Sequence, residues 1–149
     1  MAVDFARAVV DTNVILSAAL SPHGVPAEVV DWLLAHARLI FTDATFAELE
    51  SRIWKPKFDR FLSIERRRQI LHAVNVSALW VAIPPAISAQ SFSRDPTDDK
   101  FIHAALTAGP TWLVTGDKDL LVLADSLSAL GVRILAPTEA LALREFSPN

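Results

Sequence analysis

Four acidic residues lie in or beside apolar segments of this chain: Asp11, Glu48, Asp99 and Asp117. Carboxylates held close together repel one another and raise each other's pKa, so a fold has little structural reason to gather them. A divalent cation removes that repulsion, and ligands made only of oxygen favour a hard ion such as Mg²⁺ or Mn²⁺. If the fold brings these four acids together, the sequence predicts a metal site.

Short apolar segments alternate with helical segments along the chain, which predicts a parallel sheet covered by helices on both faces. We expect a single domain over residues 1–149, with a three-layer α/β/α architecture and about five strands. The expected strands are 8–10, 39–41, 80–83, 112–114 and 132–135. The expected helices are 14–20, 26–38, 44–55, 63–78, 95–108 and 120–130, a last helix starts at Pro137, and 86–94 is expected to be a surface loop.

The expected topology puts all four acids at one edge of this sheet. In open parallel sheets, ligands bind beyond the carboxyl ends of the strands. Asp11 follows the first strand and Asp117 follows the fourth. Glu48 and Asp99 lie in the first turns of helices, which begin at that same edge. Convergence of the four acids is therefore expected from the order of the elements alone.

Each acid also has a purely structural interpretation. Asp11 can cap the helix that follows it, and Asp117 or Asp119 can cap the helix further along the chain. Glu48 precedes Arg52 by four residues, the spacing of an ion pair on a helix, and alone this interpretation outweighs chemistry. The joint placement of the acids at one edge is what favours a metal site.

The adjacent pair Asp98 and Asp99 is harder to assign. Because Asp95 or Thr97 can cap the helix, both further acids exceed what capping requires. The helical period places Asp98 nearer the centre of the apolar face, so the period by itself does not select Asp99.

Composition excludes several classes of protein. The chain is 52% hydrophobic, which fits a compact domain, and it has no cysteine for disulfides or thiolate metal sites. No apolar run approaches the roughly 20 residues of a membrane span, and the N-terminal stretch lacks signal-peptide features, so we expect a cytoplasmic protein. The net charge of −3 argues against broad nucleic-acid binding, but basic residues gather between 52 and 68 and leave room for a local basic surface.

Taken in order, the segments around these acids resemble the motifs of the PIN-domain nucleases, in particular the branch of toxin components of toxin–antitoxin systems. The matching segments are DTNV at 11–14, the stretch around Glu48, RDPTDDKF at 94–101 and TGDKDL at 115–120, with further likeness at 54–58 and 135–139. The third acid of the family precedes an aliphatic residue by three positions and the fourth acid by about eighteen. Asp99 fits both spacings, so the resemblance selects it over Asp98.

The resemblance implies metal-dependent hydrolysis of RNA, with one or two Mg²⁺ or Mn²⁺ ions held by Asp11, Glu48, Asp99 and Asp117. It also implies that neighbouring residues support these acids, namely Asn13, Asp98, Thr115 and Asp119. Weaker candidates for substrate contact are Arg94, Lys100 and Lys118, although cations beside acids more often serve as screening partners. The implied partners are single-stranded or structured RNA, a cognate antitoxin protein and a second copy of the chain.

Two other functions stay open on the sequence alone. A phosphatase of the haloacid-dehalogenase kind also places an Asp after its first strand, but it requires a second acid two residues later, where Asn13 stands. A non-catalytic interaction module with an acidic pocket would use the same acids only to cap helices.

Overall fold

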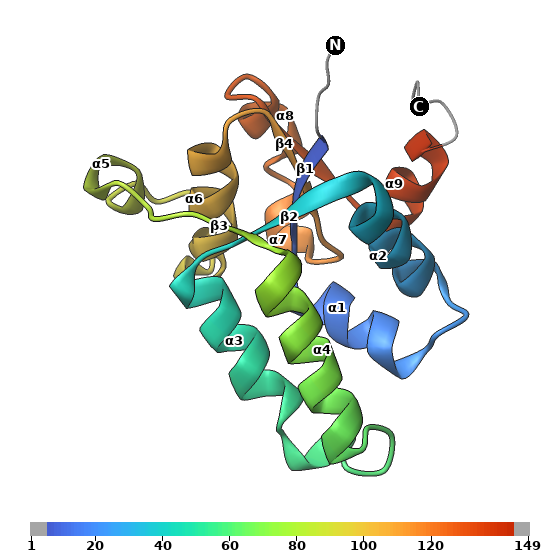
Figure 1. Ribbon diagram of the computed structural model, residues 1–149. Helices are drawn as coiled ribbons and strands as arrows, with labels where there is room; N and C mark the ends of the chain where they lie inside the picture. Colours follow the sequence, from blue (N-terminus) through green and yellow to red (C-terminus); the bar gives the residue numbers. More distant parts are fainter. Residues whose placement is uncertain (1–5, 145–149) are drawn as a thin grey trace.

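Five parallel strands form one sheet in the order β3-β2-β1-β4-β5 (Figure 1). The structure is a computed structural model and describes residues 6–144, so part of the N-terminal stretch considered above lies outside it. The strands are β1 (Ala6–Val10), β2 (Ala37–Phe41), β3 (Leu79–Trp80), β4 (Thr111–Val114) and β5 (Val132–Leu135). The predicted three-layer α/β/α class with a five-stranded parallel sheet is confirmed.

Helices connect the strands. They are α1 (Thr12–Leu20), α2 (Val25–His36), α3 (Asp43–Ile53), α4 (Ile64–Ser77), α5 (Pro85–Ser88), α6 (Asp99–Ala108), α7 (Lys118–Leu121), α8 (Ala124–Ser128) and α9 (Pro137–Arg144), with 3₁₀ turns η1 (Pro56–Phe58) and η2 (Pro96–Asp98). Their starts follow ordinary capping chemistry. Thr42 and Thr45 form a reciprocal capping box at the start of α3, and the Ser63 side chain caps α4.

The sheet is buried on both faces because successive strand residues point to opposite sides. Ala8 and Val10 belong to one core cluster, which α1, α2, α3, α4 and α9 complete. Val9 belongs to the other cluster, together with residues of α6, α7 and α8. Figure 1 shows α2 and α9 on one side of the sheet and α6 on the other. The continuous apolar runs of the sequence are thereby explained.

The chain order reverses beside β1, which fixes the position of the ligand crevice. The chain passes from β1 to β2 and β3 in one direction and returns to place β4 on the other side of β1. Val10 and Val114 are register partners, and the Asp11 N–H donates to the carbonyl oxygen of Val114 at 2.9 Å. Ligands of open α/β sheets bind at such a reversal, beyond the carboxyl ends of the two strands.

Three predicted elements differ from the structure. The third strand is only Leu79–Trp80, since it pairs with β2 alone and Pro84 and Pro85 soon follow. The expected loop at 86–94 begins within α5, because a Pro fits the first position of a helix. The single helix expected at 120–130 is two short helices, α7 and α8.

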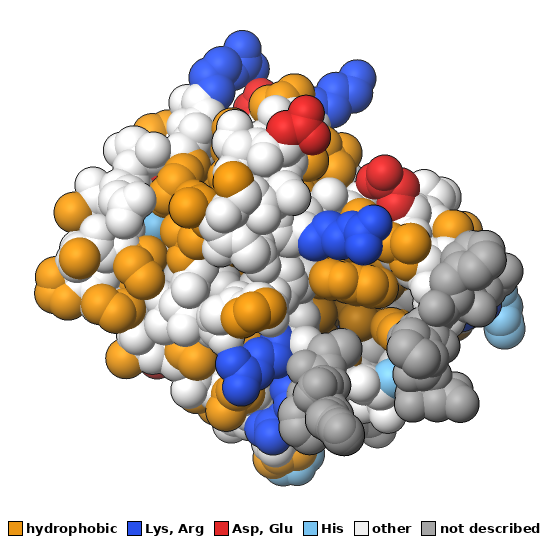
Figure 2. Space-filling model, turned by 90° about the horizontal axis from the view of Figure 1, so that it is seen from above, with side chains coloured by type: hydrophobic (Ala, Val, Ile, Leu, Met, Phe, Trp, Pro, Cys, Tyr) orange, Lys and Arg blue, Asp and Glu red, His pale blue; other side chains and the backbone are white. Residues whose placement is uncertain are grey.

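Among residues 6–144, the end of the molecule from which β1 enters the sheet shows no concentration of acids (Figure 2). Viewed from that end, Lys and Arg side chains are scattered among apolar ones and acidic side chains are isolated (Figure 2). Within residues 6–144, no helix combines the length and the apolar character that crossing a membrane requires.

Candidate metal centre

Asp11 is a buried carboxylate at the end of β1, with only 4% of its surface exposed. Its Oδ1 accepts the N–H of Asn13 at 3.2 Å as the cap of α1, and its Oδ2 accepts the hydroxyl of Thr115 at 2.7 Å. Burial raises the pKa of Asp11, these hydrogen bonds partly offset the rise, and the charges of Glu48 and Asp117 add to it. The protein therefore holds this carboxylate at an electrostatic cost.

Thr115 joins the ends of the two central strands. Its side chain is fully buried, donates to Asp11 and accepts the N–H of Asp117 at 3.0 Å. Asp117 in turn caps α7, with its Oδ1 accepting the N–H of Asp119 at 2.9 Å. One hydroxyl thus fixes the relative position of the acids that follow β1 and β4.

Replacement of Thr115 by Val is expected to lower the free energy of unfolding by about 1–3 kcal/mol, because the buried Asp11 carboxylate and the part-buried Asp117 N–H each lose a partner. Urea denaturation would measure this loss. Thr115→Ser keeps the hydroxyl and should lose less, about the worth of one buried methyl group. A Val variant as stable as the wild type would show that this hydrogen bond contributes nothing to the fold.

Three carboxylates converge beside Asp11. Carboxylate oxygens of Asp98, Asp117 and Asp119 all lie within 4.8 Å of one another. Burial, a hydrogen bond shared with the Asp117 carboxyl and the charges of Asp117, Asp95 and Asp11 raise the pKa of Asp98 to about 7. Carboxylates this close together cannot all ionise freely, and a divalent cation would relieve their repulsion.

The chemistry of this donor set fits a hard divalent ion. All three groups are carboxylates, which are the ligands that Mg²⁺ and Mn²⁺ prefer. The only cation near Asp119 among the ion pairs of residues 6–144 is Arg94, at 3.6 Å, and the Arg94 side chain is 88% exposed. An exposed ion pair of this length compensates little of the repulsion.

Asp99, the third acid that the sequence predicts, is not among the three carboxylates whose oxygens lie within 4.8 Å of one another. Its carboxylate is buried and accepts the backbone N–H groups of Phe92 and Ser93 at 3.2 and 2.7 Å. Asp98 ends η2 and Asp99 begins α6, so the two neighbouring carboxylates point in different directions. The Asp98 carboxylate lies with those of Asp117 and Asp119, whereas Asp99 is the more buried of the two, although the helical period placed Asp98 nearer the centre of the apolar face.

Glu48 lies on α3 at the same crevice but has cationic partners. Its Oε1 accepts the Lys100 ammonium at 2.8 Å and lies 3.6 Å from Nη2 of Arg52. Burial raises the pKa of Glu48, but hydrogen bonds from Lys100 and Thr12 and the charges of Lys100 and Arg52 outweigh it, so the net shift is downward. The ion pair with Arg52 that the sequence spacing suggested is present, and Lys100 adds a second one.

Asn13 and the three cations considered for substrate contact occupy different environments. Asn13 is exposed at the start of α1, and its Oδ1 accepts a hydrogen bond from Arg52 at 2.9 Å. Of the three cations considered for substrate contact, Arg94 and Lys100 pair with acids, whereas Lys118 is exposed at the start of α7. The structure therefore shows screening as the present role of two of them.

An open pocket of about 380 Å³ adjoins these acids. We call it the acidic pocket. Asp11, Asn13, Gly116 and Asp117 line it, and the space at Gly116 is open, since a Cβ added there would meet no atom within 4 Å. A substrate can therefore reach the carboxylates from solvent.

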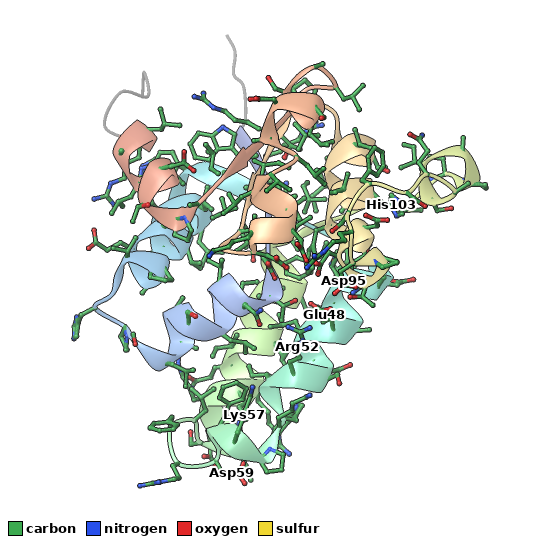
Figure 3. The ribbon with its side chains drawn as sticks, turned by 180° about the vertical axis from the view of Figure 1, so that it is seen from behind. Glu48, Arg52, Lys57, Asp59, Asp95 and His103 are labelled. Carbon is green, nitrogen blue, oxygen red and sulfur yellow. The ribbon has the colours of Figure 1, made fainter. Side chains whose placement is uncertain are left out.

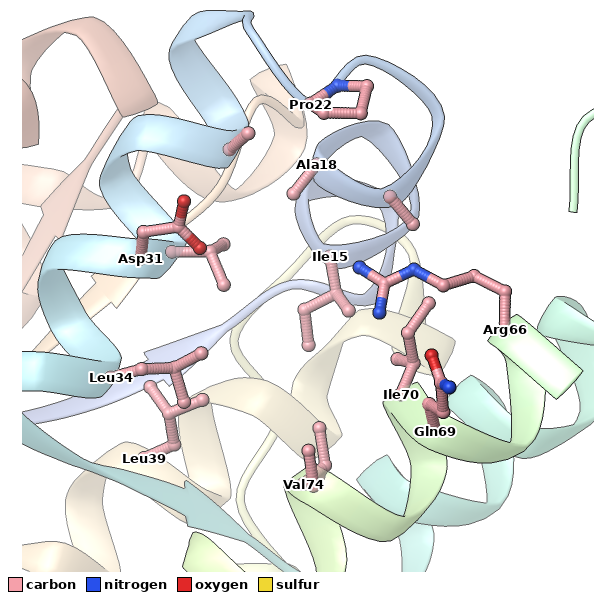
Figure 4. A pocket seen from close by; sticks show the side chains of 14 residues that line it. Ile15, Ala18, Pro22, Asp31, Leu34, Leu39, Arg66, Gln69, Ile70 and Val74 are labelled. Carbon is pink, nitrogen blue, oxygen red and sulfur yellow. The ribbon is translucent and has the colours of Figure 1, made fainter.

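A second recess, of about 230 Å³, lies away from the acids between α1, α2 and α4 (Figure 4). Its walls are mainly apolar side chains such as Ile15, Leu34 and Ile70. Asp31 and Arg66 are its charged residues, and Figure 4 shows them on different helices. A single carboxylate there offers no set of metal ligands, so we do not regard this recess as the reaction site.

Comparisons with known proteins agree with this geometry. A family model described as PIN domain matches residues 7–119. Uncharacterized protein MJ1680 of Methanocaldococcus jannaschii is 31% identical over 145 residues, which cover 94% of this chain and 91% of that protein. Two solved structures share the fold. VapBC2 from Rickettsia felis, bound to a DNA fragment from their promoter, has a TM-score of 0.59 at 11% identity, covering 87% of this chain and 98% of that chain. VapBC-1 from nontypeable Haemophilus influenzae has a TM-score of 0.57 at 17% identity, covering 89% and 98%.

Proposed function

The chain belongs to the PIN domain family, and we propose that it is a metal-dependent endoribonuclease that hydrolyses phosphodiester bonds of RNA. The observation that carries this proposal is the cluster of Asp98, Asp117 and Asp119, with oxygens within 4.8 Å of one another, beside the buried Asp11. Four carboxylates at the crevice of a parallel sheet can together bind a cation, and they suggest no other kind of catalysis.

We assign the ion to Asp11, Asp98, Asp117 and Asp119, with Glu48 at the rim of the same crevice. Asp98 takes the place that the sequence gave to Asp99, because its carboxylate lies with the other acids. Asp99 holds the segment at Phe92 and Ser93 in place through its two hydrogen bonds. When bound, Mg²⁺ or Mn²⁺ supplies an acidified water and neutralises charge on the phosphate.

The residues of the chain orient and screen the reactants. Thr115 holds the Asp11 carboxylate in one orientation through its hydroxyl. Lys100 and Arg52 neutralise Glu48 and so reduce the negative potential that an incoming phosphate meets. Because the remaining acids repel an anionic substrate, RNA should bind weakly when no divalent ion is present.

We further propose that this nuclease is the toxin of a toxin–antitoxin pair, acting in the cytoplasm as a homodimer and controlled by a cognate antitoxin. The sequence motifs resemble those of toxin components, and the two solved structures compared above are VapBC proteins.

The test of the nuclease proposal is incubation of end-labelled single-stranded RNA with Mn²⁺, with EDTA, and with Asp117→Asn. Cutting that requires Mn²⁺ and is lost in the variant is expected. Asp125→Asn removes an exposed carboxylate on α8, outside the cluster, and should cut like the wild type. Absence of cutting together with absence of Mn²⁺ binding by calorimetry would favour the non-catalytic interaction module instead.

A further inference from the structure

We propose that a basic pocket next to the acidic pocket binds an RNA phosphate that neighbours the one being cleaved. Its volume is about 160 Å³, and its lining consists of Asn13, Leu16, Arg52, Lys55, Lys57 and Phe58. The inference rests on the proposed function, since it identifies the ligand as part of the strand that the metal centre cuts.

The chain turn after α3 builds this pocket. The Lys55 N–H donates to the Arg52 carbonyl at 3.1 Å, and the Phe58 N–H donates to the Lys55 carbonyl at the same distance, so the segment folds back in 3₁₀ geometry. Phe58 is buried in the core and anchors the turn. Lys55 and Lys57 therefore project from a fixed backbone, while both side chains stay exposed.

These two lysines differ from the cations at the metal centre in having no acidic partner among residues 6–144. Lys100 and Arg52 both pair with Glu48. The ion pairs found within residues 6–144 include neither Lys55 nor Lys57, and the Lys57 ammonium lies 5.2 Å from the centre of the Phe58 ring. Their charge is available to a phosphate, which lysine binds as a compact point charge.

The basic pocket adjoins the acidic pocket. Asn13 lines both, and Arg52 lies between them, with Nη1 donating to Asn13 at 2.9 Å and Nη2 at 3.6 Å from Glu48. Figure 3 shows Glu48, Arg52 and Lys57 following one another along α3 and the turn after it. An RNA strand that leaves the metal centre past Asn13 thus passes from an acidic surface to a basic one.

This placement favours RNA over an acidic protein segment as the ligand. A phosphodiester strand carries a regular series of negative charges, so a group bound at the metal centre brings its neighbours to adjoining surfaces. With a net charge of −3, the protein has little general attraction for nucleic acid, and a local cationic contact must supply it.

The experiment measures binding separately from cleavage. Every variant carries Asp11→Asn so that the RNA stays intact, and fluorescence anisotropy follows a labelled single-stranded RNA of about twelve nucleotides in Mn²⁺ at several salt concentrations. The double variant Lys55→Ala with Lys57→Ala is expected to weaken RNA binding roughly tenfold. It should also reduce the slope of log K (the association constant) against log salt by about 0.7 for each phosphate contact that is lost. Lys55→Arg with Lys57→Arg should preserve both quantities.

The matched control is Arg38→Ala with Arg133→Ala, which removes the same charge from exposed positions near the starts of β2 and β5, away from the strand ends that carry the acids. This control should bind like the parent. Equal weakening in the control would overturn the inference, because only general charge would then matter. Unchanged affinity and slope in the lysine variant would also overturn it and would leave the pocket as a contact for an acidic protein.

Failure of the proposed function is distinguishable from failure of this inference. If the active protein cuts no RNA but binding still depends on the two lysines, the basic pocket is established and the nuclease is not. If RNA is cut and the lysine variant has an unchanged KM and an unchanged salt slope, the nuclease stands and the basic pocket is refuted. In the active protein, the expected result is a raised KM with little change in kcat.

Discussion

Replacing Asp11 by Asn is expected to reduce metal-dependent RNA cleavage by roughly a thousandfold or more, the equivalent of several kcal/mol of transition-state stabilisation. Asp11 is the buried acid at the centre of the sheet edge, between Thr115 and the start of α1. Its loss removes a negative ligand without removing volume. Initial rates with end-labelled RNA at saturating Mn²⁺ would measure the effect.

The same substitution should leave the metal-free protein equally or more stable to heat. Burial raises the pKa of Asp11, so the folded protein holds its charge at a cost that a neutral amide avoids. An Asn side chain can still accept the Asn13 N–H and can donate to the Thr115 oxygen, which has a free lone pair. Full cleavage activity in Asp11→Asn would refute the metal assignment, and a large fall in melting temperature would show a structural role instead.

Asp98→Asn is expected to weaken Mn²⁺ binding strongly and to abolish most cleavage, while Asp99→Asn should retain Mn²⁺ binding. Asp98 shares the cluster with Asp117 and Asp119, whereas Asp99 is occupied by the backbone N–H groups of Phe92 and Ser93. Calorimetric titration with Mn²⁺ would compare the two variants. The opposite result, with binding lost only in Asp99→Asn, would return the third acid to Asp99.

Removing the Asp99 carboxylate should instead affect stability. Asp99→Ala leaves the N–H groups of Phe92 and Ser93 without their acceptor and is expected to lower the free energy of unfolding by about 1–3 kcal/mol. Asp98→Ala should not lower the free energy of unfolding comparably above pH 7, because it removes the repulsion between Asp98 and its neighbouring carboxylates. Urea denaturation of both Ala variants, in EDTA, would test this contrast.

The raised pKa of Asp98 also predicts how stability depends on pH when no metal is present. Below about pH 4 the group is protonated in both folded and unfolded states and contributes nothing. Between pH 4 and about 7 the folded state binds more protons than the unfolded state, so stability falls as pH rises. The melting temperature of Asp98→Asn should therefore exceed that of the wild type by a margin that grows to about pH 7 and then levels. A constant margin across this range would contradict the raised pKa.

The amino-acid sequence by itself determined the fold class and the position of two acids. Short apolar runs identify the strands, and their alternation with helical segments predicts parallel pairing. Because Asp11 directly follows β1 and Asp117 soon follows β4, their placement at the carboxyl edge of the sheet could be predicted without any interatomic distance. The ion pair between Glu48 and Arg52 was equally accessible, since four residues on a helix make neighbours.

Only the tertiary structure shows which of the two neighbouring acids lies with Asp117 and Asp119. Motif spacing selected Asp99, but the direction of a side chain at the start of a helix depends on how the 3₁₀ turn before it joins the helix. A shift of one residue rotates that direction by about 100°, which spacing along the chain cannot resolve. The Asp99 carboxylate is instead satisfied by the segment that precedes it.

Contacts between distant segments were likewise decided by the tertiary structure alone. Thr115 and Asp11 are 104 residues apart, and Lys100 and Glu48 are 52 apart, yet each pair is joined by a hydrogen bond of 2.7 or 2.8 Å. Such pairs follow from the sheet order, in which β4 lies beside β1, and from the packing of α6 near α3. Local patterns set what each segment becomes, whereas the charge balance of the site depends on which segments the fold makes neighbours.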